Sequence, residues 1–155
     1  MDSETGVALK LWVVMNKALR SVEEHLRRQV ESHGLSFTEF AVLEVLLHRG
    51  ALPIGELGGR ILLTSGSMTY VVDKLEKRGL IRRRACPNDR RVIYAELTDE
   101  GRSLIEPVFQ EHATLIRNLM DGITPEQQQT VTELLKQLGR YAEALDPQEA
   151  LENAE

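Results

Sequence analysis

The chain has 155 residues, a formal net charge of −5, a single cysteine and 42% hydrophobic residues. This length suits one small domain with helical extensions and is enough to bury a core, while a lone cysteine excludes an internal disulfide. No basic segment followed by a long apolar run marks a signal peptide or a membrane span, so we expect a cytoplasmic protein without a membrane partner.

A long amphipathic helix is predicted near the start of the chain. Apolar residues recur from Val7 to Val30 at steps of mostly three or four, and Gly34 is expected to end this helix. The next helix has a clear start, because Ser36 and Glu39 have the spacing of a capping box before the apolar run "FAVLEVLL". Two consecutive helices are therefore expected in the first third of the chain.

A helix-turn-helix is predicted in the middle of the chain. Pro53 is expected to open a short helix, since proline is tolerated in a first turn. Thr64 or Ser65 can cap a further helix that stops at Gly79. The stripe of this helix that faces the core is predicted to be Met68, Val71, Val72 and Leu75.

Two short strands are predicted to follow the helix-turn-helix as a wing. The segments "LIRRRAC" and "RRVIYAEL" are rich in Ile, Val, Leu and Tyr, and the "PND" between them is typical of a turn. Alternation in the second strand predicts one face with Ile93, Ala95 and Leu97 and another with Val92, Tyr94 and Glu96.

Two more helices complete the prediction. Thr98 is expected to cap a helix that contains Pro107, which should bend it, and that ends near Gly122. Thr124 and Gln127 have capping-box spacing at the start of the last helix. The apolar stripe of the last helix is predicted to be Val131, Leu134, Leu135, Leu138, Tyr141, Ala142 and Leu145.

Positive charge is concentrated in the middle of this acidic chain. Residues 60–91 contain nine Lys or Arg and three Asp or Glu, a net charge of +6, so the rest of the chain carries −11. Five arginines lie within residues 82–91. Such a segment is typical of a surface that binds a polyanion, although a solvated basic face is the alternative reading of charge alone.

The helix-turn-helix and the wing supply the candidate DNA contacts. The second helix of such a motif enters the major groove with its N-terminal end, which here is rich in hydroxyl side chains. At the wing tip, Arg90 and Arg91 can reach phosphates or a narrow minor groove, and Asp89 is expected to hold an arginine in a fixed direction. The predicted contacts are Thr64, Ser65, Ser67, Met68, Thr69, Tyr70, Lys74, Arg84, Asp89, Arg90 and Arg91.

The order of these motifs resembles the MarR family of bacterial transcriptional regulators. "NDRRVIYAELTDEG" is similar to the wing signature of that family, which is Asp-x-Arg, a short strand, then Leu-Thr-x-x-Gly, and "LLTSGSMTYVVDKLEKRGLIRR" resembles its recognition helix and first wing strand. The wing signature is met by Asp89, Arg91, Leu97, Thr98 and Gly101. Within the family, the segment looks closest to regulators of quinone and hydroquinone detoxification. One departure is "GELGGR", where Gly58 and Gly59 replace the usual helix formers.

The resemblance implies a fold and a domain arrangement. The fold class is mainly α (α+β), a winged helix-turn-helix with N- and C-terminal dimerisation helices. Residues 1–34 and 103–146 are expected to form the helical dimerisation region, residues 35–102 the DNA-binding domain and residues 147–155 a polar tail. The resemblance further implies a homodimer that binds a pseudo-palindromic operator in double-stranded DNA, most often as a repressor in a stress response.

Two routes of release from DNA are compatible with the sequence. Members of the family are often released by small phenolic ligands or oxidants, and Cys86 lies among arginines that would favour a reactive thiolate. The chain has no second cysteine to resolve an oxidised one, so a ligand pocket is the preferred route. The pocket is predicted to be lined by Trp12, Phe37, Phe40, Glu44, Phe109 and His112, which suit a small aromatic effector.

Other function classes fit the sequence less well. There is no glycine-rich phosphate loop, no His and Cys cluster with metal-ligand spacing and no Ser-His-Asp arrangement, so neither an enzyme nor a cofactor is expected. Two alternatives remain open: a winged-helix module that binds protein without binding DNA, and a thiol-based redox regulator that acts through Cys86.

Overall fold

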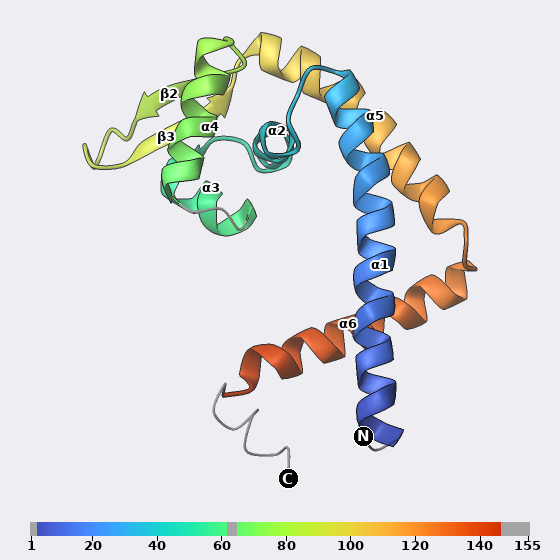
Figure 1. The fold of residues 1–155 in the computed structure, drawn as a ribbon. Coiled ribbons are helices and arrows are strands. Elements are labelled where there is room, and N and C mark those ends of the chain that lie inside the picture. The colour runs from blue at the N-terminus through green and yellow to red at the C-terminus, as the bar shows by residue number, and fades with distance from the viewer. Residues whose placement is uncertain (1–2, 62–64, 147–155) are drawn as a thin grey trace. The chain divides into compact units, whose positions relative to one another are not determined.

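The computed structural model describes residues 3–61 and 65–146, which form a mainly helical fold with one small sheet (Figure 1). One compact unit extends to Ile116 and a second begins at Arg117. The elements are α1 (Ser3–Ser32), α2 (Phe37–Arg49), β1 (Leu52–Pro53), α3 (Ile54–Ile61), α4 (Ser65–Lys77), β2 (Ile81–Ala85), β3 (Ile93–Leu97), α5 (Asp99–Met120) and α6 (Pro125–Ala144). The predicted fold class, a mainly α winged helix-turn-helix, is confirmed.

Local signals set most of the helix ends as predicted. Gly34 has a φ of 72°, a left-handed conformation that glycine adopts without a steric penalty, and α1 ends just before it. The predicted capping box of α2 is present, since the backbone N–H of Glu39 donates to Ser36 Oγ at 3.1 Å and the N–H of Ser36 donates to Glu39 Oε2 at 2.7 Å. Thr124 and Gln127 form the same reciprocal pair at the start of α6.

The core of the first unit lies between the helix-turn-helix and the sheet. All four residues of the predicted inward stripe of α4 are buried, and they join apolar side chains from α2 and from the sheet. Full burial of each large aliphatic side chain stabilises the fold by roughly 1.5–3 kcal/mol. The stripe therefore attaches the recognition helix to the body of the domain.

The sheet has three strands in the order β1–β3–β2, and both pairings are antiparallel. The β2–β3 hairpin extends away from the helices, with its turn at the far end (Figure 1). The prediction that Pro53 opens a helix was wrong, because Pro53 lies in β1 opposite Tyr94 and α3 begins at Ile54. Proline suits an edge strand as well as a first helical turn, and a strand of two residues has no periodicity to reveal it.

The wing is joined to α5 through a tight contact at Thr98. Its hydroxyl accepts from the backbone N–H of Gly101 at 3.0 Å, as predicted for a cap, and donates to Gly79 O at 2.6 Å. The backbone N–H of Thr98 donates to Leu80 O at 3.1 Å. Buried Gly101 lies against the same carbonyl, where a Cβ atom would be 2.8 Å from the carbonyl carbon of Leu80. The Leu-Thr-x-x-Gly pattern thus holds β2, β3 and α5 together.

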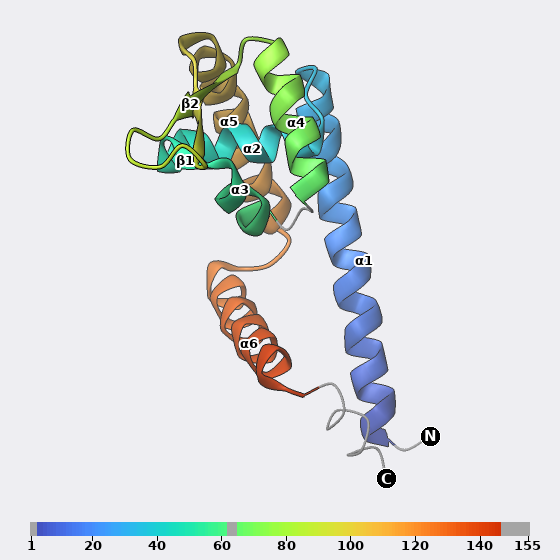
Figure 2. The same cartoon turned by 90° about the vertical axis from the view of Figure 1, so that its left-hand side faces the viewer.

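Both terminal helices expose apolar side chains. The N-terminal part of α1 extends beyond the other helices of its unit (Figure 2), and Trp12 there is 63% exposed. No residue of α6 is buried, and the predicted stripe on that helix presents Leu134 and Tyr141 to solvent in the single chain. None of the helices in the described part of the chain is long and apolar enough to cross a membrane.

Candidate nucleic-acid interface

The exposed side of α4 carries the hydroxyl side chains that the sequence singled out. Tyr70 is 68% exposed, and Ser67 and Thr69 are also on the surface. Thr64 lies outside the described residues, and Ser65 begins α4 without a description of its side chain. Met68 was also predicted as a DNA contact, and this was wrong, because it is only 1% exposed and faces the core with the rest of the apolar stripe.

Lys74, another predicted contact, has a partner within the protein. Its Nζ atom lies 3.3 Å from Glu39 Oε1, and Arg78 Nη1 lies 3.2 Å from the same oxygen. From the sequence, Glu39 was expected only to cap α2. The ion pairs depend on α2 and α4 packing side by side, so no local signal could have revealed them.

Two arginines of β2 are held across the hairpin. Arg82 Nε lies 2.6 Å from Glu96 Oε1, and Arg84 Nε lies 3.5 Å from Glu96 Oε2. The hydrogen bond from Arg82 is the main reason why the pKa of Glu96 is below its usual value, and the charges of both arginines contribute. Arg84 also lies over the ring of Tyr94, 5.3 Å from its centroid, in cation–π geometry.

The third arginine of β2 points to the recognition helix. Arg83 donates to Asp73 at 2.5 Å, and its Nη1 atom lies 3.2 Å from Glu76 Oε1. The hydrogen bond to Asp73 raises the pKa of Arg83 above its already high value. The basic run of β2 therefore connects the wing to α4 and to β3, and its charges are largely balanced within the protein.

The wing tip has the geometry that the sequence predicted for Asp89. The backbone N–H of Arg91 donates to Asp89 Oδ1 at 3.0 Å, and its guanidinium donates to both carboxylate oxygens at 3.2 and 3.4 Å. These bonds, led by the one from the backbone, lower the pKa of Asp89. The Arg91 side chain is nevertheless 91% exposed, so it is both directed and accessible. Neighbouring Arg90 has no ion pair within the described residues.

Cys86 directly follows β2 and is half-buried. Its backbone N–H donates to Val92 O at 3.0 Å, which closes the hairpin before the turn. The thiol is free.

Part of the predicted effector pocket comes together between α2 and α5. The rings of Phe40 and His112 lie 4.4 Å apart, and the rings of His48 and Phe109 lie 4.5 Å apart, edge to face. His112 Nδ1 lies 3.0 Å from Gln29 Oε1 of α1, and burial lowers the pKa of this histidine. His48 was not among the predicted pocket residues, although it follows Glu44 at the i,i+4 spacing of one helix face.

Two predicted pocket residues lie elsewhere. Trp12 is seventeen residues before Gln29 on the continuous helix α1, which places it roughly 25 Å along the helix from the histidine cluster. Phe37 is exposed at the first turn of α2. Within the described residues, neither Trp12 nor Phe37 makes a ring contact with Phe40 or His112.

Glu44 opens onto a surface depression of about 490 Å³ between α2 and α3, lined by Glu44, Val45, His48, Arg49 and Arg60. Burial raises the pKa of Glu44, and the charge of His48 partly offsets this shift. Neither arginine has an ion pair within the described part of the chain. The depression thus combines a carboxyl group whose pKa is raised by burial with two cations that are available to an anionic group.

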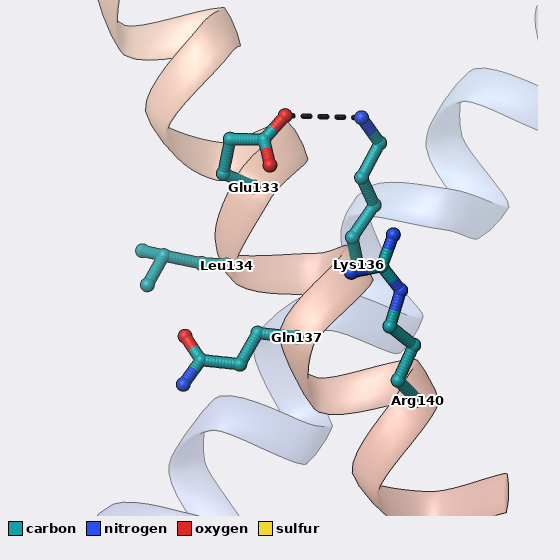
Figure 3. A pocket seen from close by; sticks show the side chains of 5 residues that line it. All are labelled: Glu133, Leu134, Lys136, Gln137 and Arg140. Atoms are coloured by element: carbon teal, nitrogen blue, oxygen red, sulfur yellow. Dashed lines mark hydrogen bonds and ion pairs between the residues drawn. The ribbon is translucent and has the colours of Figure 1, made fainter.

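A second depression lies along α6 (Figure 3), with Glu133, Leu134, Lys136, Gln137 and Arg140 around it. All five side chains come from one helix, and Lys136 Nζ forms an ion pair with Glu133 Oε1 at 3.0 Å. A groove with walls from a single helix cannot enclose a small molecule, so it is a feature of the helix surface.

Comparison with known proteins finds transcriptional regulators. The model of the MarR family matches residues 35–93, from the start of α2 into the wing. The chain is similar to the HTH-type transcriptional regulator MhqR of Bacillus subtilis (strain 168), with 44% identity over 138 residues, which are 89% of this chain and 95% of the relative.

Solved structures share the fold. A MarR family transcriptional regulator from Streptomyces coelicolor, solved in complex with DNA, has a TM-score of 0.79 at 30% identity, over 95% of this chain and 91% of that one. AbsC, a MarR family transcriptional regulator from the same organism, has a TM-score of 0.80 at 20% identity, over 94% of this chain and 98% of that one.

Proposed function

The chain belongs to the MarR family of transcriptional regulators, and on this premise we propose that it is a homodimeric cytoplasmic repressor released from its operator by a small aromatic molecule. Its relatives are named as regulators, and the chain is not an enzyme. The observation that carries the proposal is the wing tip, where Asp89 directs an exposed Arg91 on the same domain as the hydroxyl-rich face of α4.

We propose that α4 reads the major groove while the wing follows the DNA backbone. Ser67, Thr69 and Tyr70 would contact phosphates or base edges, and Arg90 and Arg91 would reach phosphates or the adjacent minor groove. A relative at 30% identity was solved in complex with DNA, which supports this assignment. A module that binds only protein would have no need for a directed and exposed arginine at its wing tip.

The dimer is proposed from the two terminal helices. Residues 1–34 and 103–146 carry apolar side chains, such as Trp12, Leu134 and Tyr141, that a single chain leaves in water. Exposed patches of this kind mark interfaces in proteins that do not span membranes. Two recognition helices in such a dimer would read half-sites about one helical turn apart, which requires a pseudo-palindromic operator.

The effector is proposed to be a phenol, a hydroquinone or a quinone. Glu44 can accept a hydrogen bond from the hydroxyl of a phenol or hydroquinone, and Arg49 or Arg60 can donate to a quinone oxygen or neutralise a phenolate. Aromatic rings of Phe109 and His48 flank this region. Binding here would bias the position of α2 and α3 relative to α5, and thereby the recognition helix.

The proposal is tested by selecting DNA with the purified protein and measuring binding to the selected sequence by fluorescence anisotropy. We expect a sequence with dyad symmetry, a dimer in sedimentation at micromolar concentration, and weaker binding in the presence of a hydroquinone or its quinone. A monomer, or a selected sequence without a dyad, would refute the dimeric repressor. Equal affinity for all sequences at every salt concentration would favour a function other than operator recognition.

A further inference from the structure

A buried carboxylate connects the start of α2 to the end of the recognition helix. Glu39 is 2% exposed, and both of its oxygens are occupied. Oε2 accepts the backbone N–H of Ser36 at 2.7 Å, while Oε1 lies 3.3 Å from Lys74 Nζ and 3.2 Å from Arg78 Nη1. Lys74 is in the last turn of α4, and Arg78 is the residue that follows the helix.

Capping alone does not explain a charge at this position. A glutamine at the third position of a helix completes a capping box as well as a glutamate does, and Gln127 fills that place in α6. A buried carboxylate is costly unless charged partners compensate for its lost hydration. Burial alone would raise the pKa of Glu39, yet the bond from Ser36 and the two cations lower it overall, so the group is ionised at neutral pH.

The other ion pairs of α4 join it to the wing and not to α2, since Arg83 of β2 pairs with Asp73 and Glu76. The buried stripe of α4 is apolar, and it includes Met68, whose flexible side chain adapts to small shifts of the helix. Apolar contacts are not directional, whereas an ion pair with hydrogen-bond geometry fixes both rotation and translation. Lys74 and Arg78 lie four residues apart on one side of the helix, so a single carboxylate can hold both.

We propose that Glu39 is a positioning residue for DNA recognition. Through Lys74 and Arg78 it fixes the rotation and depth of α4, on which discrimination of the operator from other DNA depends, and it withholds Lys74 from phosphate. This inference rests on the proposed function as a DNA-binding regulator. It predicts that loss of the charge reduces specificity without reducing general affinity for DNA.

The decisive variant is Glu39→Gln, which keeps the size of the side chain and its ability to cap α2. The measured quantity is the ratio of the affinities for the selected operator and for a scrambled duplex of the same length and composition. We expect this ratio to fall at least fivefold, with binding to the scrambled duplex unchanged or tighter. The salt dependence of that binding should become steeper, because Lys74 is released to phosphate.

Ser36→Ala is the matched control. It removes the hydroxyl that caps α2 but leaves the carboxylate with Lys74 and Arg78. We expect this variant to melt at a lower temperature and to keep the wild-type affinity ratio. In a double-mutant cycle, Arg78→Met should have little further effect on the ratio in the Glu39→Gln background, because both changes break the same contact.

An unchanged ratio of operator affinity to scrambled-duplex affinity in Glu39→Gln would overturn the inference. An equal fall of this ratio in Ser36→Ala would also overturn it, because Glu39 would then act only by stabilising the fold. The same measurement on the wild-type protein distinguishes failure of this inference from failure of the proposed function. If the wild type itself does not distinguish the selected duplex from the scrambled one, the proposed function fails and the inference fails with it.

Discussion

Gly101→Ala tests whether the junction of wing and α5 is as tight as the structure shows. The added Cβ would lie 2.8 Å from the carbonyl carbon of Leu80 and closer still to its oxygen. That carbonyl cannot turn away without losing the N–H of Thr98, which it accepts at 3.1 Å. Since backbone has to move, the cost should be at or above the upper end of the roughly 1–3 kcal/mol typical of overpacking.

Alanine also favours a helix over glycine by about 1 kcal/mol, so two effects compete. We expect a net loss of at least about 2 kcal/mol, which lowers the melting temperature by roughly 4–8 °C or more for a chain of this length. The matched control is Gly59→Ala in α3, where an added Cβ meets nothing within 4 Å. It should stabilise the protein by roughly 0.5–1 kcal/mol. Thermal unfolding by circular dichroism measures both, and a Gly101→Ala protein as stable as the wild type would refute the steric argument.

Three further predictions concern the wing, the effector and pH. Asp89→Ala should weaken operator binding by roughly 3- to 10-fold per subunit, because Arg91 then has to be ordered on the DNA; tighter binding at two salt concentrations would show that charge repulsion dominates instead. In anisotropy titrations, a hydroquinone should still weaken operator binding by Cys86→Ser but should no longer weaken binding by Glu44→Ala. The reverse pattern would mean that the thiol controls release from DNA. Burial lowers the pKa of His112 in the folded state, so as the pH falls this histidine is protonated in the unfolded chain before it is protonated in the folded one. The free energy of unfolding should therefore fall as the pH drops below about 6.5. Melting curves at pH 7.5 and 5.5 measure this loss, which His112→Gln should reduce.

The parts of the fold that the sequence predicted well depend on neighbours along the chain. The capping boxes at Ser36 and Thr124 and the stop at Gly34 need only a few adjacent residues, and the structure has all three. The strand β1 could not be predicted in this way, because Leu52 and Pro53 are extended only through their pairing with β3. Its existence depends on a partner about forty residues away in sequence.

In the candidate site, too, contacts between residues close in sequence could be predicted, whereas contacts between different elements could not. Asp89 and Arg91 are two residues apart, so their pairing could be predicted from the sequence, and the structure contains it. The partners of Lys74 and of the β2 arginines come from other elements, and the register of β2 against β3 decides that Arg82 and Arg84 share Glu96. Composition therefore overstated the positive charge that this region presents to a ligand.

This internal pairing leads to an expected salt dependence of DNA binding. Of the nine cations in residues 60–91, six have carboxylate partners, namely Lys74, Arg78, Arg82, Arg83, Arg84 and Arg91. Only Arg60, Lys77 and Arg90 have no ion pair within the described residues, and Arg60 lines the depression beside α2.

Lys77, Arg90 and the directed Arg91 leave about three phosphate contacts per subunit. At about 0.9 per contact, a dimer should show a slope of log affinity against log salt near −5, whereas nine contacts per subunit would give about −16. A measured slope close to the larger value would mean that the ion pairs open on DNA. In that case, the wing arginines would serve affinity rather than the architecture of the domain.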